Sequence, residues 1–493
     1  KRRKKVKKLN NLVDDYDIPV SKLHIESIRE SGVKIRTISK WMNAVSVEGS
    51  YQQIESVLKF SFVKKIEPVF SGKRIKAKPQ LKKVHSDSSF YGNSYNQLDQ
   101  INLIQLHELG YSGKNVRILV LDSGFYLDHE VFDSLNIIAA YDFVKQDTIV
   151  SNEIGDPPNQ HNHGTQVLSV LAGFKPETLV GSAYGAEFLL GKTEDVSLEL
   201  PIEEDNYIEG LEWGESLGAD ILSSSIGYID WYSQNDLDGS TAIITQAVNI
   251  AIELGMVIVT AVGNSGTGGI VAPADAFDII SCGAVDDNGI ISSFSSRGPT
   301  ADGRIKPEVC AQGNGTFSAT AISTTSYGTG LGTSLAAPLI SGACALLLEA
   351  HPNWTPAQIR NSILNTANNF DTPDNTYGWG IVDAFAALLY DQTETPSDSV
   401  FYISNGYPNP CGKMVSFTLD NSPSLNMKLS IVDIKGASSY ERNYTLLQNE
   451  NIVHLNLKDY PSGVYMINFD FKNIAPITRK ICHIKGMENP CPE

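Results

Sequence analysis

At 493 residues the chain is too long for one ordinary domain, and its length predicts about three domains. With 42% hydrophobic and 19% charged residues, its composition is typical of a folded globular protein. No apolar run approaches the roughly 20 residues that span a bilayer, so the sequence predicts no transmembrane segment.

Charge is distributed unevenly along the chain, whose net charge is −17. Residues 1–85 hold 21 basic and 8 acidic residues, a net charge of +13, whereas residues 86–399 hold 9 and 40, a net charge of −31. A basic head can indicate a nucleic-acid-binding arm, but no nucleic-acid-binding motif accompanies this one. We therefore expect no nucleic-acid partner and instead expect the head to complement the acidic part of the same chain.

The six cysteines include no CxxC pair, which argues against zinc and thioredoxin-type chemistry. An even number of cysteines in an exported protein permits disulfides, but their connectivity does not follow from sequence. Cys282–Cys310 and Cys411–Cys482 are the candidate pairs, and the apolar helical pattern around Cys344 predicts a core position.

The first 88 residues form two regions of different composition. Residues 1–70 predict a small α+β domain, with strand-like KIRTIS and NAVSVEG followed by an amphipathic helix around YQQIESVLKF. Residues 71–88 are polar and rich in lysine, which is typical of an exposed linker.

Residues 89–390 alternate between apolar strands and helical patterns. VRILVLD (116–122) is an almost continuous apolar run that ends in a carboxylate, as expected of a buried parallel strand. ADILSSSIG (219–227) and GMVIVTAVGN (255–264) repeat this design. The alternation predicts an α/β domain with a parallel sheet and helices on both faces, and ligands bind at the carboxyl ends of such strands.

The C-terminal part of the chain changes character again. Residues 391–399 form a short polar linker, and residues 400–493 contain short alternating strands separated by turn signals. This pattern predicts an all-β sandwich of about 90 residues.

Four segments place a reactive side chain at the end of a regular element. Asp122 ends a buried strand, where a carboxylate needs a partner, and His163 opens a helix. Ser334 begins an apolar helix after two glycines, where small neighbours admit a substrate and the helix terminus favours negative charge. Asn264 follows a buried strand, and its amide can donate hydrogen bonds.

Acyl transfer requires these groups together. A serine hydroxyl becomes a good nucleophile when an imidazole takes its proton, and a carboxylate must orient that imidazole. The oxyanion that forms needs preorganised donors. Each residue alone is more often a turn former, an exposed histidine or a helix cap, but their joint occurrence in this chain order favours catalysis.

Through DSG, HGT, SSSIG, AVGNSG and GTSLAAP, residues 89–390 resemble the subtilases, a family of serine peptidases. The resemblance implies that Asp122 is the orienting carboxylate, His163 the general base and acid, and Ser334 the nucleophile. Asn264 and the backbone N–H of Ser334 would form the oxyanion hole.

The same resemblance implies six substrate-binding residues. The first three would pair with the substrate backbone as an extra strand, and all six would wall the pocket for the residue before the scissile bond. These residues are Ser225, Ile226, Gly227, Ala261, Val262 and Gly263.

Two positions depart from the family pattern. Gln166 stands where many relatives have a second histidine, and Leu335 stands where many have methionine after the nucleophile. Neither belongs to the catalytic triad of Asp122, His163 and Ser334, so the implied chemistry is unaffected.

The resemblance implies no organic cofactor. Calcium is common in the family, but no ligands for it can be assigned from the sequence. His161 and His163 could be read as a metal pair, but no third ligand has suitable spacing, so zinc is not expected.

The segment SKWMNAVSVEG…IEPV (39–69) resembles the propeptide domain of subtilases, which aids folding and blocks the cleft. The alternative is an unrelated small ferredoxin-like module.

The tail resembles the sorting domain that the type IX secretion machinery of Bacteroidota recognises. The alternative is an accessory sandwich that binds glycans or proteins. The matching pieces are GYPNP (406–410), IVDIKG (431–436), LKDYPSGVYMINF (457–469) and RKICHIK (479–485).

The resemblances together predict a secreted or cell-surface serine endopeptidase, made as a zymogen and exported through the periplasm. It would hydrolyse internal peptide bonds of proteins or peptides through an acyl-enzyme. Its partners would be its substrates, its own propeptide as an intramolecular inhibitor, and the type IX machinery. The alternative is a surface adhesion or binding protein that uses the sandwich and a non-catalytic cleft.

Overall fold

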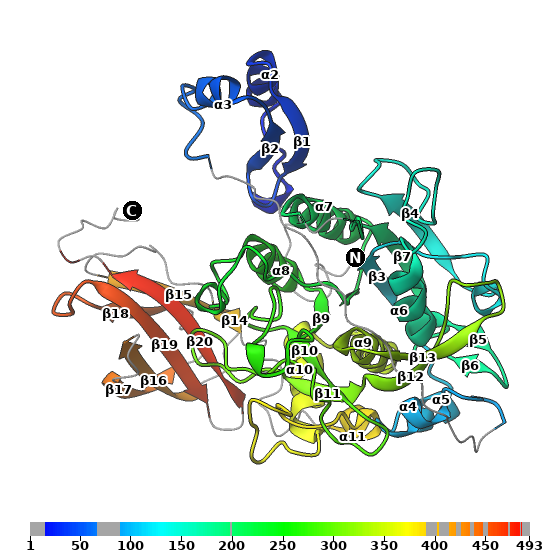
Figure 1. Cartoon of the computed structure of the whole chain (residues 1–493). Coiled ribbons are helices and arrows are strands. Elements are labelled where there is room, and N and C mark those ends of the chain that lie inside the picture. Colours follow the sequence, from blue (N-terminus) through cyan, green and yellow to red (C-terminus); the bar gives the residue numbers. More distant parts are fainter. Residues whose placement is uncertain are drawn as a thin grey trace. The chain divides into compact units, whose positions relative to one another are not determined.

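The computed structural model of the chain describes residues 15–66, 89–197 and 200–390, together with the strands and some connecting residues within 402–485 (Figure 1). The chain divides into two units, the first ending at Leu388 and the second beginning at Leu389.

The N-terminal part of the first unit is a small α+β assembly in which a two-stranded antiparallel sheet and two helices share a core. Ser50 caps the second helix in a reciprocal pair with Gln53, which explains why that helix begins after the polar turn Gly49–Ser50. The expected α+β class is confirmed. The elements are α2 Lys22–Glu30, β1 Lys34–Ser39, β2 Ala44–Glu48 and α3 Tyr51–Val57.

A seven-stranded sheet organises the rest of this unit, in the order β11-β10-β9-β8-β3-β7-β4. Every pair of neighbours is parallel, which confirms the predicted sheet type. The strands are β3 Arg117–Asp122, β4 Ile137–Asp142, β7 Glu187–Lys192, β8 Ile221–Ser224, β9 Val257–Ala261, β10 Ile280–Val285 and β11 Val309–Gln312.

Helices cover both faces of this sheet, as predicted. Along β3, Ile118 and Val120 join the core that contains α6 and α9, whereas Leu119 and Leu121 join the core that contains α7 and α8. The alternation follows from the two-residue period of a strand and explains why VRILVLD is apolar at nearly every position. The helices are α6 Asn162–Ala172, α7 Ile202–Ser216, α8 Ile243–Glu253 and α9 Thr333–Ala350.

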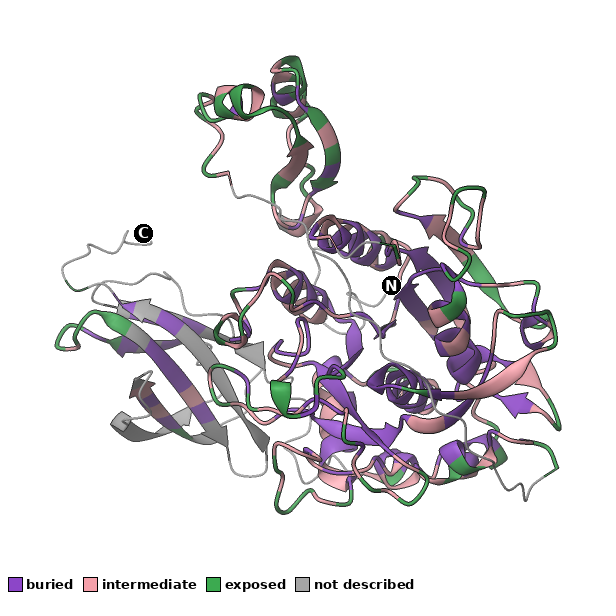
Figure 2. Ribbon diagram, viewed as in Figure 1, coloured by how far each residue is buried: buried purple, intermediate pink, exposed green. Residues whose placement is uncertain are grey.

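Helix α9 crosses the middle of the domain and is buried along almost its whole length, as Figure 2 shows. Among the described residues it is the one helix long and apolar enough to cross a membrane, and 89% of its apolar window is buried inside the protein. A core helix of a globular domain meets the same criteria, and the packing of α9 against β8, β9 and β10 identifies it as one.

Shorter elements complete the first unit. β12 and β13 form an antiparallel hairpin that leads into α9, and α10 begins with a capping box between Thr355 and Gln358. These elements are α4 Tyr95–Asp99, α5 Ile104–Glu108, β5 Phe174–Lys175, β6 Leu179–Val180, β12 Asn314–Ala319, β13 Tyr327–Leu331, α10 Pro356–Thr366 and α11 Ala384–Leu389.

The second unit consists of two antiparallel sheets, β14-β15-β18 and β17-β16-β19-β20, whose inward side chains share one core. Phe417 and Phe469 meet edge to face at its centre, with ring centroids 5.1 Å apart. The predicted all-β sandwich is confirmed. Its strands are β14 Tyr402–Ile403, β15 Met414–Asp420, β16 Leu425–Asp433, β17 Ser438–Leu446, β18 Ile452–Asn456, β19 Gly463–Phe471 and β20 Ile474–His483.

The candidate disulfide Cys282–Cys310 is wrong, because both cysteines are free and buried. In the β10–β11 register Cys282 lies opposite Val309, so Cys310 falls one position later and points to the other face of the sheet. Cys344 is a buried core residue, as predicted. Cys411 lies outside the described residues, so the second candidate pair stays a prediction.

A buried carboxylate in the first turn of α7 titrates unusually. Burial raises the pKa of Glu204 to about 7. Hydrogen bonds from Trp231 Nε1 and Tyr232 Oη, each 3.0 Å long, favour the ionised form but do not offset the burial. Since the ordinary value of 4.5 applies in the unfolded chain, this group stabilises the fold fully below pH 4.5 and loses that contribution as pH rises through 7.

We expect Glu204→Gln to remove this pH dependence, because the amide stays neutral. Between pH 5 and pH 8 the unfolding free energy of the wild type should fall relative to that of the variant by on the order of 3 kcal/mol. Urea unfolding in a Ser334→Ala background, which avoids self-digestion, measures this difference. The exposed control Glu108→Gln should behave as wild type, and parallel pH curves for wild type and Glu204→Gln would contradict the expectation.

Candidate active site

Asp122 and His163 form the first contact of the site. Asp122 is the last residue of β3 and is fully buried, and His163 is the second residue of α6, with a side chain 41% exposed. The Oδ1 atom of Asp122 accepts hydrogen bonds from Nδ1 of His163 at 2.8 Å and from the N–H of Ser123 at 2.7 Å. Because the carboxylate accepts at Nδ1, the hydrogen is held on that nitrogen and Nε2 is left as the basic one.

The close approach of α6 to the end of β3 explains the glycine after His163. A Cβ atom on Gly164 would collide with the carbonyl oxygen of Gly124 and would lie 3.0 Å from Oδ1 of Asp122. Only a residue without a side chain lets the helix begin this close to the carboxylate.

Ser334 is the second residue of α9 and is buried. The preceding Gly332 has φ +148°, a conformation that glycine adopts readily. Oγ of Ser334 donates to the carbonyl of Ser225 at 3.4 Å, and Oγ of Ser225 donates to the carbonyl of Ser334 at 2.8 Å. Across the described part of this domain no hydrogen bond joins Ser334 to His163, and such contacts commonly tighten only when substrate binds.

Asn264 lies on the exposed turn after β9. Its Oδ1 accepts from the N–H of Thr333 at 2.9 Å and from Oγ1 of Thr333 at 3.1 Å. These bonds fix the orientation of the amide and leave its Nδ2 hydrogens available to a ligand at the N-terminus of α9. That terminus also carries the backbone N–H of Ser334 and the positive end of the helix dipole.

The six predicted substrate-binding residues come together because β8 and β9 are neighbours. Residues 225–227 follow the end of β8, and residues 261–263 span the end of β9. Thr333 Oγ1 donates to the carbonyl of Gly263 at 3.2 Å, which ties the second segment to α9. Both segments therefore border Ser334, one through Ser225 and the other through Thr333.

Gln160 is a site residue that the sequence did not indicate. It is almost fully buried, and its Nε2 donates to the carbonyls of Ser123 at 2.7 Å and Glu194 at 2.5 Å. Its Oε1 accepts from the N–H of Val196 at 3.1 Å. One side chain thus joins the loop after β3, the loop after β7 and the turn before α6. A lone glutamine in a loop carries no sequence signal for such a role.

A second link continues from that loop to the substrate-binding segment. The hydroxyl of Tyr228 donates to Oε1 of Glu194, and Tyr228 is fully buried directly after Gly227. Burial raises the pKa of Tyr228 well above its ordinary value, so the phenol stays a donor.

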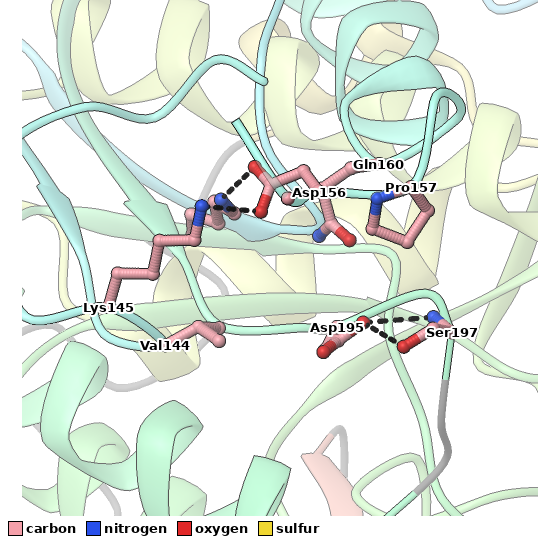
Figure 3. A pocket seen from close by; sticks show the side chains of 9 residues that line it. Val144, Lys145, Asp156, Pro157, Gln160, Asp195 and Ser197 are labelled. Atoms are coloured by element: carbon pink, nitrogen blue, oxygen red, sulfur yellow. Dashed lines mark hydrogen bonds and ion pairs between the residues drawn. The ribbon is translucent and has the colours of Figure 1, made fainter. Parts of the chain in front are cut away.

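Beside these loops lies a polar cavity of about 320 Å³ (Figure 3). Lys192, which pairs in register with Asp122 on one side and Asp142 on the other, places Nζ 2.8 Å from Asp142 and 3.0 Å from Asp156. Lys145 lies 2.6 Å from Asp156. The cavity is lined by Val144, Lys145, Gly155, Asp156, Pro157, Gln160, Lys192, Asp195 and Ser197.

Within the described residues the one acidic group compact enough for a metal ion is Asp142, Asp147 and Glu153. Calcium takes 6–8 oxygen ligands and is repelled by ammonium groups. Here Lys192 lies 2.8 Å from Asp142, and Lys145 lies 3.4 Å from Glu153, so two cations already neutralise the carboxylates. The cluster does not fit calcium.

A carboxylate–imidazole pair, a serine and an amide donor at the carboxyl ends of a parallel sheet have the arrangement of a serine hydrolase. The model of the Subtilase family matches residues 113–380, more than half of the chain, and the protein belongs to this family. It is therefore a serine endopeptidase.

Two further family models match the flanking regions. The Peptidase S8 propeptide domain of Bacteroidota matches residues 1–86, and the Secretion system C-terminal sorting domain matches residues 405–485. Both resemblances found in the sequence are confirmed. The sorting domain indicates export by the type IX system, which gives a secreted or cell-surface protein.

Characterised proteins agree with this assignment. Subtilisin Savinase from Lederbergia lenta is 32% identical over 57% of this chain and 93% of its own length. Subtilisin E from Bacillus subtilis (strain 168) is 30% identical over 73% of this chain and 84% of its own length. The structure of MycP3 protease from the type VII (ESX-3) secretion system shares the fold, with TM-score 0.52 and 20% identity over 62% of this chain and 91% of that one.

Gln160→Leu should lower both activity and stability. The substitution leaves two buried carbonyls without partners, at roughly 1–3 kcal/mol each, and removes the acceptor of the partly buried N–H of Val196. The loops that carry Asp122 and His163 would also lose their shared tether, which should lower kcat/KM roughly 10–100-fold. Peptide hydrolysis and thermal unfolding measure the two effects. The neighbouring exposed Asn159→Leu is the matched control, and equal kinetics for the two variants would contradict the tethering role.

Proposed function

We propose that the chain is the zymogen of an enzyme that hydrolyses internal peptide bonds of proteins through an acyl-enzyme on Ser334. The observation that carries the proposal is the 2.8 Å hydrogen bond between Asp122 and His163 on α6, a helix that packs against α9, which has Ser334 at its N-terminus.

In the proposed mechanism Nε2 of His163 takes the proton from Oγ of Ser334 as that oxygen attacks the scissile carbonyl. Asp122 stabilises the resulting imidazolium. The tetrahedral oxyanion accepts hydrogen bonds from the N–H of Ser334 and from Nδ2 of Asn264.

When the intermediate collapses, the C–N bond breaks and His163 gives its proton to the departing amine. The acyl group stays on Ser334. A water molecule then attacks the ester carbonyl, gives a proton to His163, and releases the carboxylic acid as the proton returns to Ser334.

The substrate backbone would lie along residues 225–227 as an additional strand, because this segment leaves the sheet next to Ser334. Ser225, Ile226 and Gly227 would bind the backbone. Ala261, Val262 and Gly263 would form the opposite wall for the side chain before the scissile bond.

The contact between the N-terminal domain and α7 supports zymogen control. Glu212 on α7 accepts hydrogen bonds from Oγ of Ser39 at 2.6 Å, the N–H of Lys40 at 3.3 Å and the N–H of Trp41 at 3.2 Å. Trp41 is 5% exposed and packs into the core formed with α7 and α8. A domain anchored there would act as the intramolecular inhibitor until it is removed.

We also propose the boundaries of the parts. Residues 1–70 would be the propeptide and 71–88 the processing linker, followed by the catalytic domain at 89–390. A second linker at 391–399 would precede the sorting domain at 400–493, which would be the part that the type IX machinery recognises. A non-catalytic adhesion protein fits less well, because such a protein would not require the oriented imidazole and amide.

Substitutions at Ser334 and Asn264 test the proposed chemistry. Ser334→Ala should fold normally and lose nearly all activity. Asn264→Ala should lower kcat about 10²–10³-fold, the effect of removing the equivalent donor in a subtilisin. Labelling with a fluorophosphonate and peptide hydrolysis by the propeptide-free enzyme measure these effects. Wild-type activity in Ser334→Ala, free of contaminating proteases, would falsify the assignment.

Glu212→Ala should weaken inhibition by the propeptide, because three donors of residues 39–41 would lose a charged acceptor. Each hydrogen bond to a charged group is worth about 1.5–3 kcal/mol, so the inhibition constant of residues 1–85 added to mature enzyme should rise at least tenfold. Asp230→Ala is the matched control, since it removes one exposed acidic charge from the same domain. Equal inhibition constants for both variants would mean that only net charge matters.

A further inference from the structure

Val271 lies against both glycines of the candidate substrate pocket. A Cβ atom on Gly227 would collide with Cγ2 of Val271, and a Cβ on Gly263 would lie 3.1 Å from its Cγ1 and 3.3 Å from its Cγ2. Gly227 ends one wall of the pocket and Gly263 ends the other. The isopropyl group of Val271 therefore fills the space that the two missing side chains leave.

The backbone of Val271 and Ala272 links the two walls of the pocket. The N–H of Val271 donates to the carbonyl of Val262 at 3.3 Å, and Ala272 exchanges two hydrogen bonds with Tyr228, at 3.0 and 2.8 Å. Residues 271–272 thus cross from the β9 wall to the segment that follows β8. This crossing makes Val271 the floor between the walls.

The exposure and the rigidity of Val271 support its place between the two walls. Val271 is partly exposed, whereas its neighbours Ile270 and Ala272 are fully buried. A β-branched side chain has little freedom at χ1, and contacts with two backbone walls restrict it further. Val271 cannot easily move aside for an incoming group.

We propose that Val271 makes the enzyme select small side chains, such as those of glycine, alanine and serine, at the position before the scissile bond. This inference rests on the proposed function of the site. An aromatic or long side chain needs an open slot between the two backbone walls, and the isopropyl group occupies it. An alanine methyl group ends before it reaches that floor.

Mismatches of one methylene in such pockets change kcat/KM roughly 10–200-fold, so the discrimination against phenylalanine should be at least tenfold. The substrates are peptides that differ only in glycine, alanine, valine or phenylalanine before the cleaved bond. The mature enzyme should cleave the alanine peptide at least tenfold faster than the phenylalanine peptide, by kcat/KM.

Val271→Gly should raise the ratio of phenylalanine to alanine cleavage about 10–100-fold. Val271→Ala, a smaller change that leaves the backbone less free, should give an intermediate ratio. Val144→Ala, which removes the same two methyl groups at the cavity of Figure 3, should leave the ratio unchanged.

Active-site titration with a fluorophosphonate distinguishes a failure of the role of Val271 from a failure of the proposed function. If every form is labelled and wild type cleaves the phenylalanine peptide as well as the alanine peptide, the role of Val271 is overturned while the proposed function stands. An unchanged ratio in both Val271 variants has the same meaning. If wild type is neither labelled nor able to cleave any of the peptides, the proposed function itself fails.

Discussion

A carboxylate buried at the end of a parallel strand needs hydrogen-bond partners, and the fold supplies them to Oδ1 of Asp122 through the imidazole of His163 and the N–H of Ser123. This requirement fixes where α6 begins. Gly164 is needed because the first turn of the helix packs against the loop after β3, and Gln160 ties that turn to the same loop. The geometry of the candidate base is thus a consequence of how one buried charge is accommodated.

The remaining groups reach the same place because parallel strands end at one edge of the sheet. β8 and β9 deliver the segments 225–227 and 261–263, and α9 begins where both can contact it. The serine and the amide are therefore positioned by three elements that are distant in sequence. Packing of α9 against the sheet holds the N-terminus of this helix in place, as the proposed oxyanion hole requires.

Two buried acidic residues on α7, Glu204 and Glu212, differ in the partners that their carboxylates have. Glu204 is buried, and no ion pair joins it to a cation within the described part of the chain, so its charge costs free energy near neutral pH. Burial also raises the pKa of Glu212, but donors from residues 39–41 oppose that shift. The charge difference between the head and the acidic body can speed their association, whereas these directed hydrogen bonds fix where the head binds.

The sequence by itself determined the class of the fold and the two flanking domains, and it indicated the four candidate reactive residues. Strand periodicity and glycine-flanked motifs are local properties of the sequence, and the order of the motifs can be followed directly along the chain. Gln160, Tyr228 and Val271 could not be found this way, because their roles depend on contacts between segments far apart in the chain. The candidate pair Cys282–Cys310 failed for a related reason, since the register of two strands decides which faces their side chains share. Short motifs therefore indicate the candidate reactive residues, whereas the hydrogen bonds of Gln160 and the proposed place of Val271 between two pocket walls form only when the strands lie side by side.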